Sequence, residues 1–131
     1  MIDVEAVVRS WLITIDKLTA EFGTRIYAGR YLPSGYKTAD GPALLFAVRG
    51  GRQDYSSKIL ESSMQFRVYG ETEGEARKAS QAVYDGINDQ QARGICYARM
   101  EEGTMPVLMT EPGSDWPYVL MYFKFFIQND E

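Results

Sequence analysis

Histidine is absent from this sequence of 131 residues, and cysteine occurs once, at Cys96. The lack of histidine removes the commonest general base and the commonest metal ligand. A single cysteine excludes an internal disulfide and a zinc site built from several cysteines. Because Cys96 lies in an apolar stretch, ICYARM, we expect a core thiol and not a nucleophile of low pKa. The sequence therefore predicts no enzyme, with no catalytic residue, no metal site and no cofactor.

Long apolar runs and a surplus of basic residues are missing too. No apolar run approaches the length of a membrane span, and no basic-then-apolar segment resembling a signal peptide opens the chain. The formal net charge is −4, whereas proteins that grip nucleic acid usually carry a basic surplus. Aromatic residues, in contrast, are plentiful at 13%, and nine are tyrosines. Tyrosine keeps a polar tip, so this composition favours contact surfaces that are only partly dry.

One stretch, from Ser56 to Asn88, organises the expected fold. Apolar and polar side chains alternate over residues 60–68, the period of a strand buried on one face. Thr72 and Glu75 have the spacing of a capping box at the start of the next helix. Behind this box, small apolar residues recur at helical spacing over residues 76–87, so the helix can lie close on the sheet.

The remaining elements complete one domain, residues 1–131. We expect a first helix over residues 4–22, capped by Asp3 and ended by Gly23. Further strand candidates occur at residues 25–28, 43–48, 95–100, 104–110 and 117–128. Gly50-Gly51 predicts a hairpin turn after the second of these candidates, and residues 90–94 are expected as a loop. The predicted class is α+β, a single domain with a mostly antiparallel mixed sheet of four to five strands and two helices packed on it.

Two segments are candidate contact regions. The connection over residues 29–42 is longer than most loops inside a compact domain, and such loops are more often functional than not. It is either a solvated loop whose tyrosines fold back over the core or a contact loop for a partner subunit. At the predicted hairpin tip, Arg49 and Arg52 flank two glycines. These glycines join strands and do not open a helix, so we favour contact with an acidic neighbour over a phosphate cradle.

The last strand candidate, residues 117–128, has one wholly apolar face and a second, mixed face. The mixed face is too apolar for plain solvent and too polar for core, so we expect it to meet another chain or a helix edge. Glu101 and Glu102 are interpreted as a solvated turn and not as an acid–base pair, because adjacent strand residues point to opposite faces. The predicted partner-contact residues are Arg30, Tyr31, Tyr36, Lys37, Arg49, Arg52, Tyr118 and Tyr122.

Four stretches carry a family resemblance: RIYAGRYLP, GPALLFAV, MQFRVYGETEGEARKASQAVYDGIN and YVLMYFKFFIQ. With them, the chain resembles the tail terminator (tail-completion) proteins of long-tailed, siphovirus-like bacteriophages and prophages, roughly from Val4 to Gln128. The most telling part is VYGETEGEA, in which a strand ends in an aromatic-Gly-x-Thr turn that leads directly into an Ala-rich helix. The family has no catalytic motif, and no contact residue is carried over from it.

The resemblance implies a small α/β domain that assembles with itself as a ring, commonly of six subunits. Such a ring caps the finished tail tube, stops its polymerisation and presents a surface to the neck proteins of the head. The implied partners are the tail tube protein and the head or neck connector proteins, and the implied place is the tail–neck junction of a virion assembled in the host cytoplasm. Six copies at −4 each would carry −24, so an acidic lumen would let DNA pass without specific binding.

Three alternatives stay open from the residues alone. A head–tail joining or neck protein of the same virion has a similar size and composition. A ligand-binding α/β regulatory domain would show a defined pocket with convergent polar groups. A small enzyme would have to rely on Asp, Glu, Lys, Tyr or Cys96.

Overall fold

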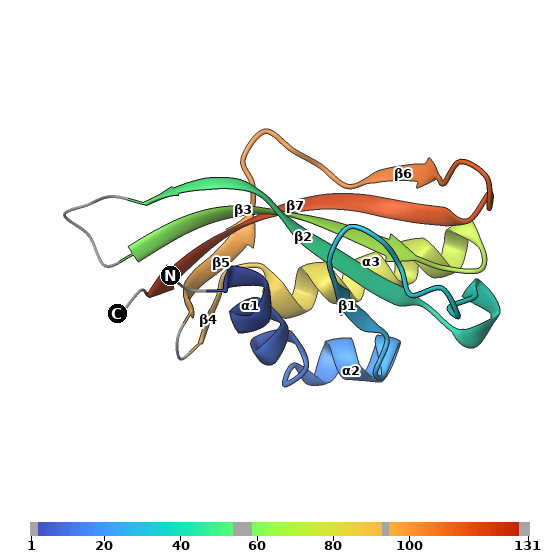
Figure 1. The fold of residues 1–131 in the computed structure, drawn as a ribbon, viewed down its shortest axis with the longest axis horizontal. Helices are drawn as coiled ribbons and strands as arrows, with labels where there is room; N and C mark the ends of the chain where they lie inside the picture. The colour runs from blue at the N-terminus through green and yellow to red at the C-terminus, as the bar shows by residue number, and fades with distance from the viewer. Residues whose placement is uncertain (1–2, 54–58, 93–94, 129–131) are drawn as a thin grey trace.

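The computed structural model of the protein describes residues 3–53, 59–92 and 95–128. Its helices are α1 (Val4–Leu12), α2 (Asp16–Phe22) and α3 (Glu73–Ile87), and a short 3-10 helix, η1, spans Thr38–Asp40. Its strands are β1 (Ile26–Ala28), β2 (Ala43–Gln53), β3 (Ile59–Tyr69), β4 (Gln90–Ala92), β5 (Ile95–Met100), β6 (Val107–Thr110) and β7 (Pro117–Gln128) (Figure 1). The α+β class is as predicted, but the described chain has three α-helices and seven strands, not the two helices and four to five strands expected.

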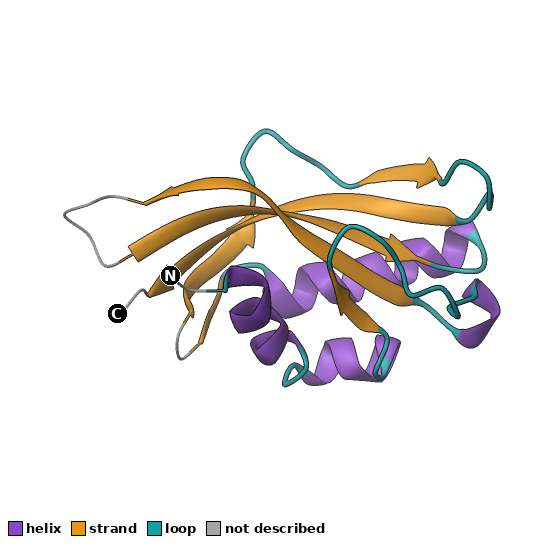
Figure 2. Cartoon of the chain, in the orientation of Figure 1, coloured by secondary structure: helices purple, strands orange, loops and turns teal. Residues whose placement is uncertain are grey.

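All seven strands belong to one sheet. Their order is β1-β2-β3-β7-β5-β4, and β6 pairs with the first part of β7 while β5 pairs with its later part. The β1–β2 pair is parallel, and the other described pairs are antiparallel. The prediction of a mostly antiparallel mixed sheet is therefore confirmed. The sheet is strongly twisted, as Figure 2 shows, and α1, α2 and α3 all lie on the same side of it.

The core lies between this side of the sheet and the helices. Alternate residues of β3 and β7 point into it, and Phe66 stands at its centre. Phe66 stacks with Phe46 and Phe125 at centroid distances of 5.5 and 5.9 Å and meets Phe123 edge-on at 5.2 Å. Burial of each such side chain stabilises the fold by about 1.5–3 kcal/mol. The predicted apolar faces of residues 60–68 and 117–128 are therefore confirmed as the core faces of the two central strands.

The first helix is interrupted, which corrects the prediction of one helix over residues 4–22. Asp3 caps α1 as expected by accepting a hydrogen bond from the backbone N–H of Ala6 at 3.1 Å. The helix ends at Leu12, and the hydroxyl of Thr14 donates to the carbonyl of Trp11 at 2.6 Å. Three consecutive β-branched residues, 13–15, weaken the helix here, since they lose side-chain freedom in it, and a threonine hydroxyl competes for helix carbonyls. Gly23 ends α2 at a φ of 58°, as predicted.

The entry into α3 follows the sequence closely. Thr72 accepts a hydrogen bond from the backbone N–H of Glu75 at 3.2 Å. The carboxylate of Glu75 reaches back to the N–H of Glu71 at 3.1 Å and not to that of Thr72, so the box is displaced by one residue. Gly70 leaves β3 in close contact with the first turn of α3, and a Cβ added there would lie 2.5 Å from the backbone nitrogen of Ala76.

Two turn predictions were wrong. Gly50 and Gly51 lie inside β2, opposite Ser63 and Ser62, at a register shift of the β2–β3 pair. The hairpin exists, but its strands run on to Gln53 and Ile59, and residues 54–58 lie outside the described part of the chain. A glycine pair can mark a bulge as well as a turn, since both need a backbone free of side-chain constraint. Residues 90–94, expected as a loop, begin with β4, which pairs with β5.

Candidate partner-binding surface

The face of the sheet turned away from α1, α2 and α3 is named the helix-free face. Residues directly opposite one another in antiparallel strands point to the same side, so the pairing fixes its members. Along β2, β3 and β7 they include Leu45, Ala47, Glu61, Ser63, Gln65, Arg67, Tyr69, Tyr118, Leu120, Tyr122, Lys124 and Phe126. This is the mixed face that the sequence indicated for the last strand. No described helix covers it (Figure 1), so, of the two predicted alternatives, contact with another chain remains the prediction.

An exposed apolar strip borders this face along β6. Val107 pairs with Leu120 and Met109 with Tyr118, which places both on the helix-free side. Val107 is 48% exposed, Met109 40% and Met105, just before β6, 73%. We define these three residues as the apolar strip. β6 is an edge strand, as Pro106 predicted, and among the described residues only β7 pairs with it. An edge strand with exposed apolar side chains is a surface that other chains can pair with.

The 29–42 loop folds over the helix-free face at the start of β7, the same end of the strands that β6 pairs with. Leu45, Tyr69 and Tyr118 form a small buried cluster there, against which Leu32 of the loop and Trp116 pack. Within the loop, Tyr36 is only 6% exposed, and its hydroxyl donates to the carbonyl of Gly41 at 2.6 Å. Burial raises the pKa of the Tyr36 hydroxyl to about 12. Two alternatives were open for this loop. Tyr36 fits the one in which the loop's tyrosines fold back over the core.

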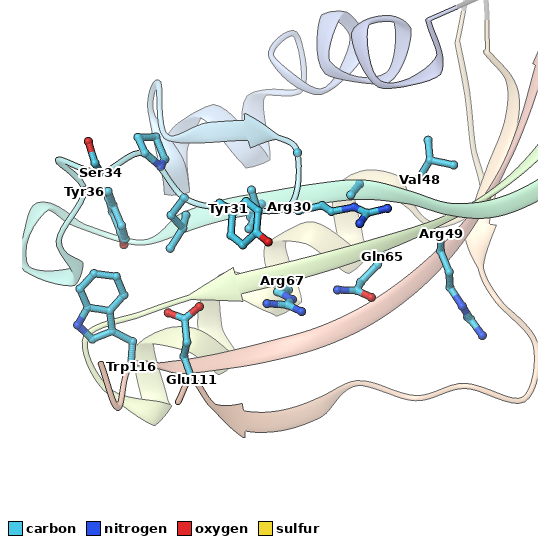
Figure 3. Close-up of a pocket in the computed structure, with 15 residues that line it drawn as sticks. Arg30, Tyr31, Ser34, Tyr36, Val48, Arg49, Gln65, Arg67, Glu111 and Trp116 are labelled. Carbon is cyan, nitrogen blue, oxygen red and sulfur yellow. The ribbon is translucent and has the colours of Figure 1, made fainter. Parts of the chain in front are cut away.

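A cleft of about 670 Å³ lies between this loop, the exposed sides of β2 and β3, and the connection that leads into β7. Figure 3 shows its lining, which combines an apolar floor with guanidinium groups from three different segments. Arg30 comes from the loop, Arg49 from β2 and Arg67 from β3, and Glu111, which follows β6, also lines the cleft. The cleft therefore holds more positive than negative side chains, although the whole protein is acidic.

Arg67 is held at the centre of the cleft. Its guanidinium lies over the ring of Tyr118 at 5.3 Å and bonds to Tyr69, whose hydroxyl donates to Glu111 Oε1 at 3.1 Å. Burial lowers the pKa of Arg67, but the bond to Tyr69 and the charge of Glu111 outweigh it, so the pKa lies above its ordinary value. Burial also raises the pKa of Tyr69 to about 12. Arg67 thus remains charged and fixed in position.

Arg49 is also partnered within the chain. Its Nη1 lies 3.2 Å from Glu101 Oε2, and its guanidinium lies 4.3 Å from the centre of the Tyr122 ring. The hydroxyl of Ser63 donates to the same carboxylate oxygen at 3.0 Å. The predicted turn is present, but the Glu101 side chain is only 20% exposed, so the prediction that it would be solvated was wrong. Glu102, 83% exposed, instead pairs with Arg99, and the two carboxylates do not share a site.

The remaining predicted contact residues are placed as follows. Arg30 and Tyr31 stand at the mouth of the cleft, where Tyr31 is 86% exposed and Arg30 is exposed as well. Lys37 is exposed but does not line the cleft. Tyr118 is buried beneath the loop, and the side chain of Arg52 lies outside the described part of the chain. The structure therefore brings Arg30, Tyr31, Tyr36 and Arg49 together around one cleft.

Sequence reasoning missed several residues of this surface, chiefly Gln65, Arg67, Glu111 and Trp116. The alternation of residues 60–68 placed Arg67 on the face away from the core, but it could not show that a distant loop would fold over that face. Within residues 3–53, 59–92 and 95–128, no group of three or more Cys, Asp or Glu residues could hold a metal ion. None of the described helices is long and apolar enough to span a membrane.

Comparison with known proteins bears on the fold. No family model and no curated protein matches the sequence. Among solved structures, one similar chain belongs to the "virion of native gene transfer agent (GTA) particle", with a TM-score of 0.67 and 16% sequence identity. The match covers 95% of this chain and 93% of that one. The protein therefore shares its fold, over nearly its whole length, with a component of a GTA virion.

Proposed function

We propose that this protein is a structural component of a phage-like virion and, within it, the tail terminator. In this role, copies of the chain form a ring, of six subunits, that caps the tail tube and ends its polymerisation. The observation that carries the proposal is the likeness in fold to a chain of a GTA virion, which extends over almost the full length of both chains. The resemblance of stretches such as VYGETEGEA to tail terminator proteins points in the same direction.

The helix-free face supports a role in assembly. It presents the apolar strip along an unpaired edge, half-buried aromatic side chains on β7, and Tyr31 at the mouth of the cleft. Interfaces between proteins are enriched in aromatic residues and methionine, which this face offers. In the proposed ring, the strip and the cleft meet neighbouring subunits, while other surfaces meet the tube protein and the neck proteins. DNA passes through the bore without specific binding, and a bore that proved basic would contradict this part of the proposal.

Two alternatives make different predictions. A head–tail joining or neck protein of the same virion would bind the head connector and not the ends of the tube. A ligand-binding domain is favoured by one observation, the cleft, whose volume of about 670 Å³ lies in the range of small-molecule sites. Native mass spectrometry of the purified protein separates this alternative, since a resident ligand would add a fixed mass to each subunit.

The first test is the mass of the protein in solution, measured by light scattering over a range of concentrations, with negative-stain imaging of the same sample. The proposal predicts closed rings of about six subunits at high concentration or after addition of the tail tube protein. A monomer under both conditions would contradict the ring. A ring that binds the head connector but not the tube would favour the neck protein.

A further inference from the structure

The three guanidinium groups of the cleft differ in how the chain satisfies them. Arg67 is bonded to Tyr69 and lies near Glu111, and Arg49 is paired with Glu101. Arg30, in contrast, has no ion-pair or hydrogen-bond partner within the part of the chain that the structure describes. It is exposed at the mouth, next to the exposed ring of Tyr31. The cleft thus presents one positive charge that no described residue pairs with.

Unpaired negative charge lies in the turn that leads from β3 into α3. Glu71, Glu73 and Glu75 are all exposed there. The carboxylate of Glu75 is used inside the turn, where it accepts from the N–H of Glu71. The carboxylates of Glu71 and Glu73 have no hydrogen-bond or ion-pair partner among residues 3–53, 59–92 and 95–128.

Among the described residues of one subunit, this acidic turn does not pair with Arg30. The backbone N–H of Gly70 donates to the carbonyl of Pro117 at 3.3 Å, which fixes the turn at the start of β7. α3 then runs along the side of the sheet opposite the helix-free face (Figure 2). The turn therefore lies beside Trp116, which lines one end of the cleft, whereas Arg30 comes from the loop that follows β1. Complementary charges that do not pair within one subunit can pair between two.

We propose that the cleft of one subunit receives the Glu71–Glu75 turn of a second copy of this chain, with Arg30 paired to the carboxylates of Glu71 and Glu73. The contact joins two different surfaces, so it is head-to-tail, the geometry that generates closed rings. Opposite charges at such a contact fix its register and speed association, and Tyr31 covers the ion pair from the rim. The inference rests on the proposed ring and adds which surfaces form it.

Charge exchange tests the contact on the full chain. Arg30→Glu and Glu73→Arg each place like charges at the contact and should raise the concentration needed for assembly by about tenfold or more, because like charges at a contact weaken association. The double variant Arg30→Glu/Glu73→Arg restores the opposite charges and should recover most of the loss. Lys17→Glu and Glu21→Arg, on α2, serve as matched controls and should assemble like the unmodified protein.

The outcomes separate this inference from the proposed function. Assembly of the Arg30→Glu and Glu73→Arg variants at the unmodified concentration would overturn the contact and leave the ring proposal standing. Loss of tube binding by Arg30→Glu with an intact ring would assign the cleft to another virion protein and would also overturn it. Failure of the unmodified protein to assemble, with or without tube protein, would contradict both. Urea unfolding of each variant verifies that Arg30 and Glu73, both exposed, can be changed without loss of the fold.

Discussion

The ring of Tyr36 packs edge-on against the indole of Trp116, with centroids 5.7 Å apart and an interplanar angle of 80°. Tyr36 belongs to the 29–42 loop, and Trp116 directly precedes β7. The contact therefore ties a long loop to the end of a central strand and forms one end of the cleft. Edge-on aromatic pairs contribute about 0.5–1.5 kcal/mol beyond the burial of their area. The cleft is thus a preformed part of the fold and not a gap beneath a free loop.

The hydroxyl of Tyr36 should contribute to stability, whereas that of Tyr31 should not. Tyr36→Phe removes the bond to the carbonyl of Gly41 and should lower the free energy of unfolding by about 1 kcal/mol. Tyr31→Phe, at a ring that is 86% exposed, should leave it unchanged. Urea unfolding of the two variants checks the difference. Equal stability of both would mean that the loop is not held by Tyr36.

Stability should fall in alkaline solution for a specific reason. Burial raises the pKa of Tyr36 and of Tyr69 to about 12, above the ordinary value of about 10 that tyrosine keeps in an unfolded chain. The folded protein therefore retains protons that the unfolded chain releases, so this contribution is complete below pH 10 and is lost as pH rises from about 10 to 12. Urea unfolding across this range, with phenolate absorbance, should show a shallower decline for Tyr36→Phe/Tyr69→Phe. If the free energy of unfolding of the variant fell as steeply with pH as that of the unmodified protein, the decline would not come from Tyr36 and Tyr69.

Replacement of two glycines near the start of α3 by alanine should have opposite effects on the stability of the protein. Gly70→Ala places a Cβ 2.5 Å from a backbone nitrogen of the helix, and overpacking of this kind costs about 1–3 kcal/mol. Gly74→Ala meets nothing closer than 3.9 Å, at Thr72 Oγ1, and should stabilise the helix by up to about 1 kcal/mol. Thermal unfolding of both variants tests the pair. A stable Gly70→Ala protein would show that β3 and α3 can separate there without cost.

The apolar strip should matter for assembly and not for folding. Val107→Lys and Met109→Lys alter side chains that are 48% and 40% exposed, so the free energy of unfolding of a subunit should change by less than about 0.5 kcal/mol. The added charges should raise the concentration needed for ring formation, which light scattering measures. Gln81→Lys, exposed on α3, is the control. If the Val107→Lys and Met109→Lys variants form rings as readily as the unmodified protein, the strip is not part of the interface.

Local patterns predicted the elements better than their connections. The alternation of residues 117–128 matches the bounds of β7, and Thr72 caps α3 as its spacing indicated. The apolar stripe of the first helix continues across residues 13–15 with no sign of the break, because both halves bury residues in the same core. Periodicity records which residues are buried and not whether the backbone between them stays helical.

The candidate site depended on information that is not local. Arg30, Tyr31 and Tyr36 could be selected from the length and composition of their loop. Arg67 and Glu111 could not, since their role follows from a cleft formed by segments far apart in the sequence. The alternation of β3 placed Arg67 on the exposed face, but only the folded chain brings Tyr69 and Glu111 to it.

The central claim, that this protein ends a tail tube, is tested most directly by adding it to the tail tube protein of the same virion during polymerisation. Electron microscopy then gives the distribution of tube lengths and the fraction of tube ends that carry a ring. The proposal predicts that growth stops, that rings occupy one end of each tube, and that Arg30→Glu lowers the occupied fraction. Tubes that grow to the same length with and without the protein, with bare ends, would contradict it.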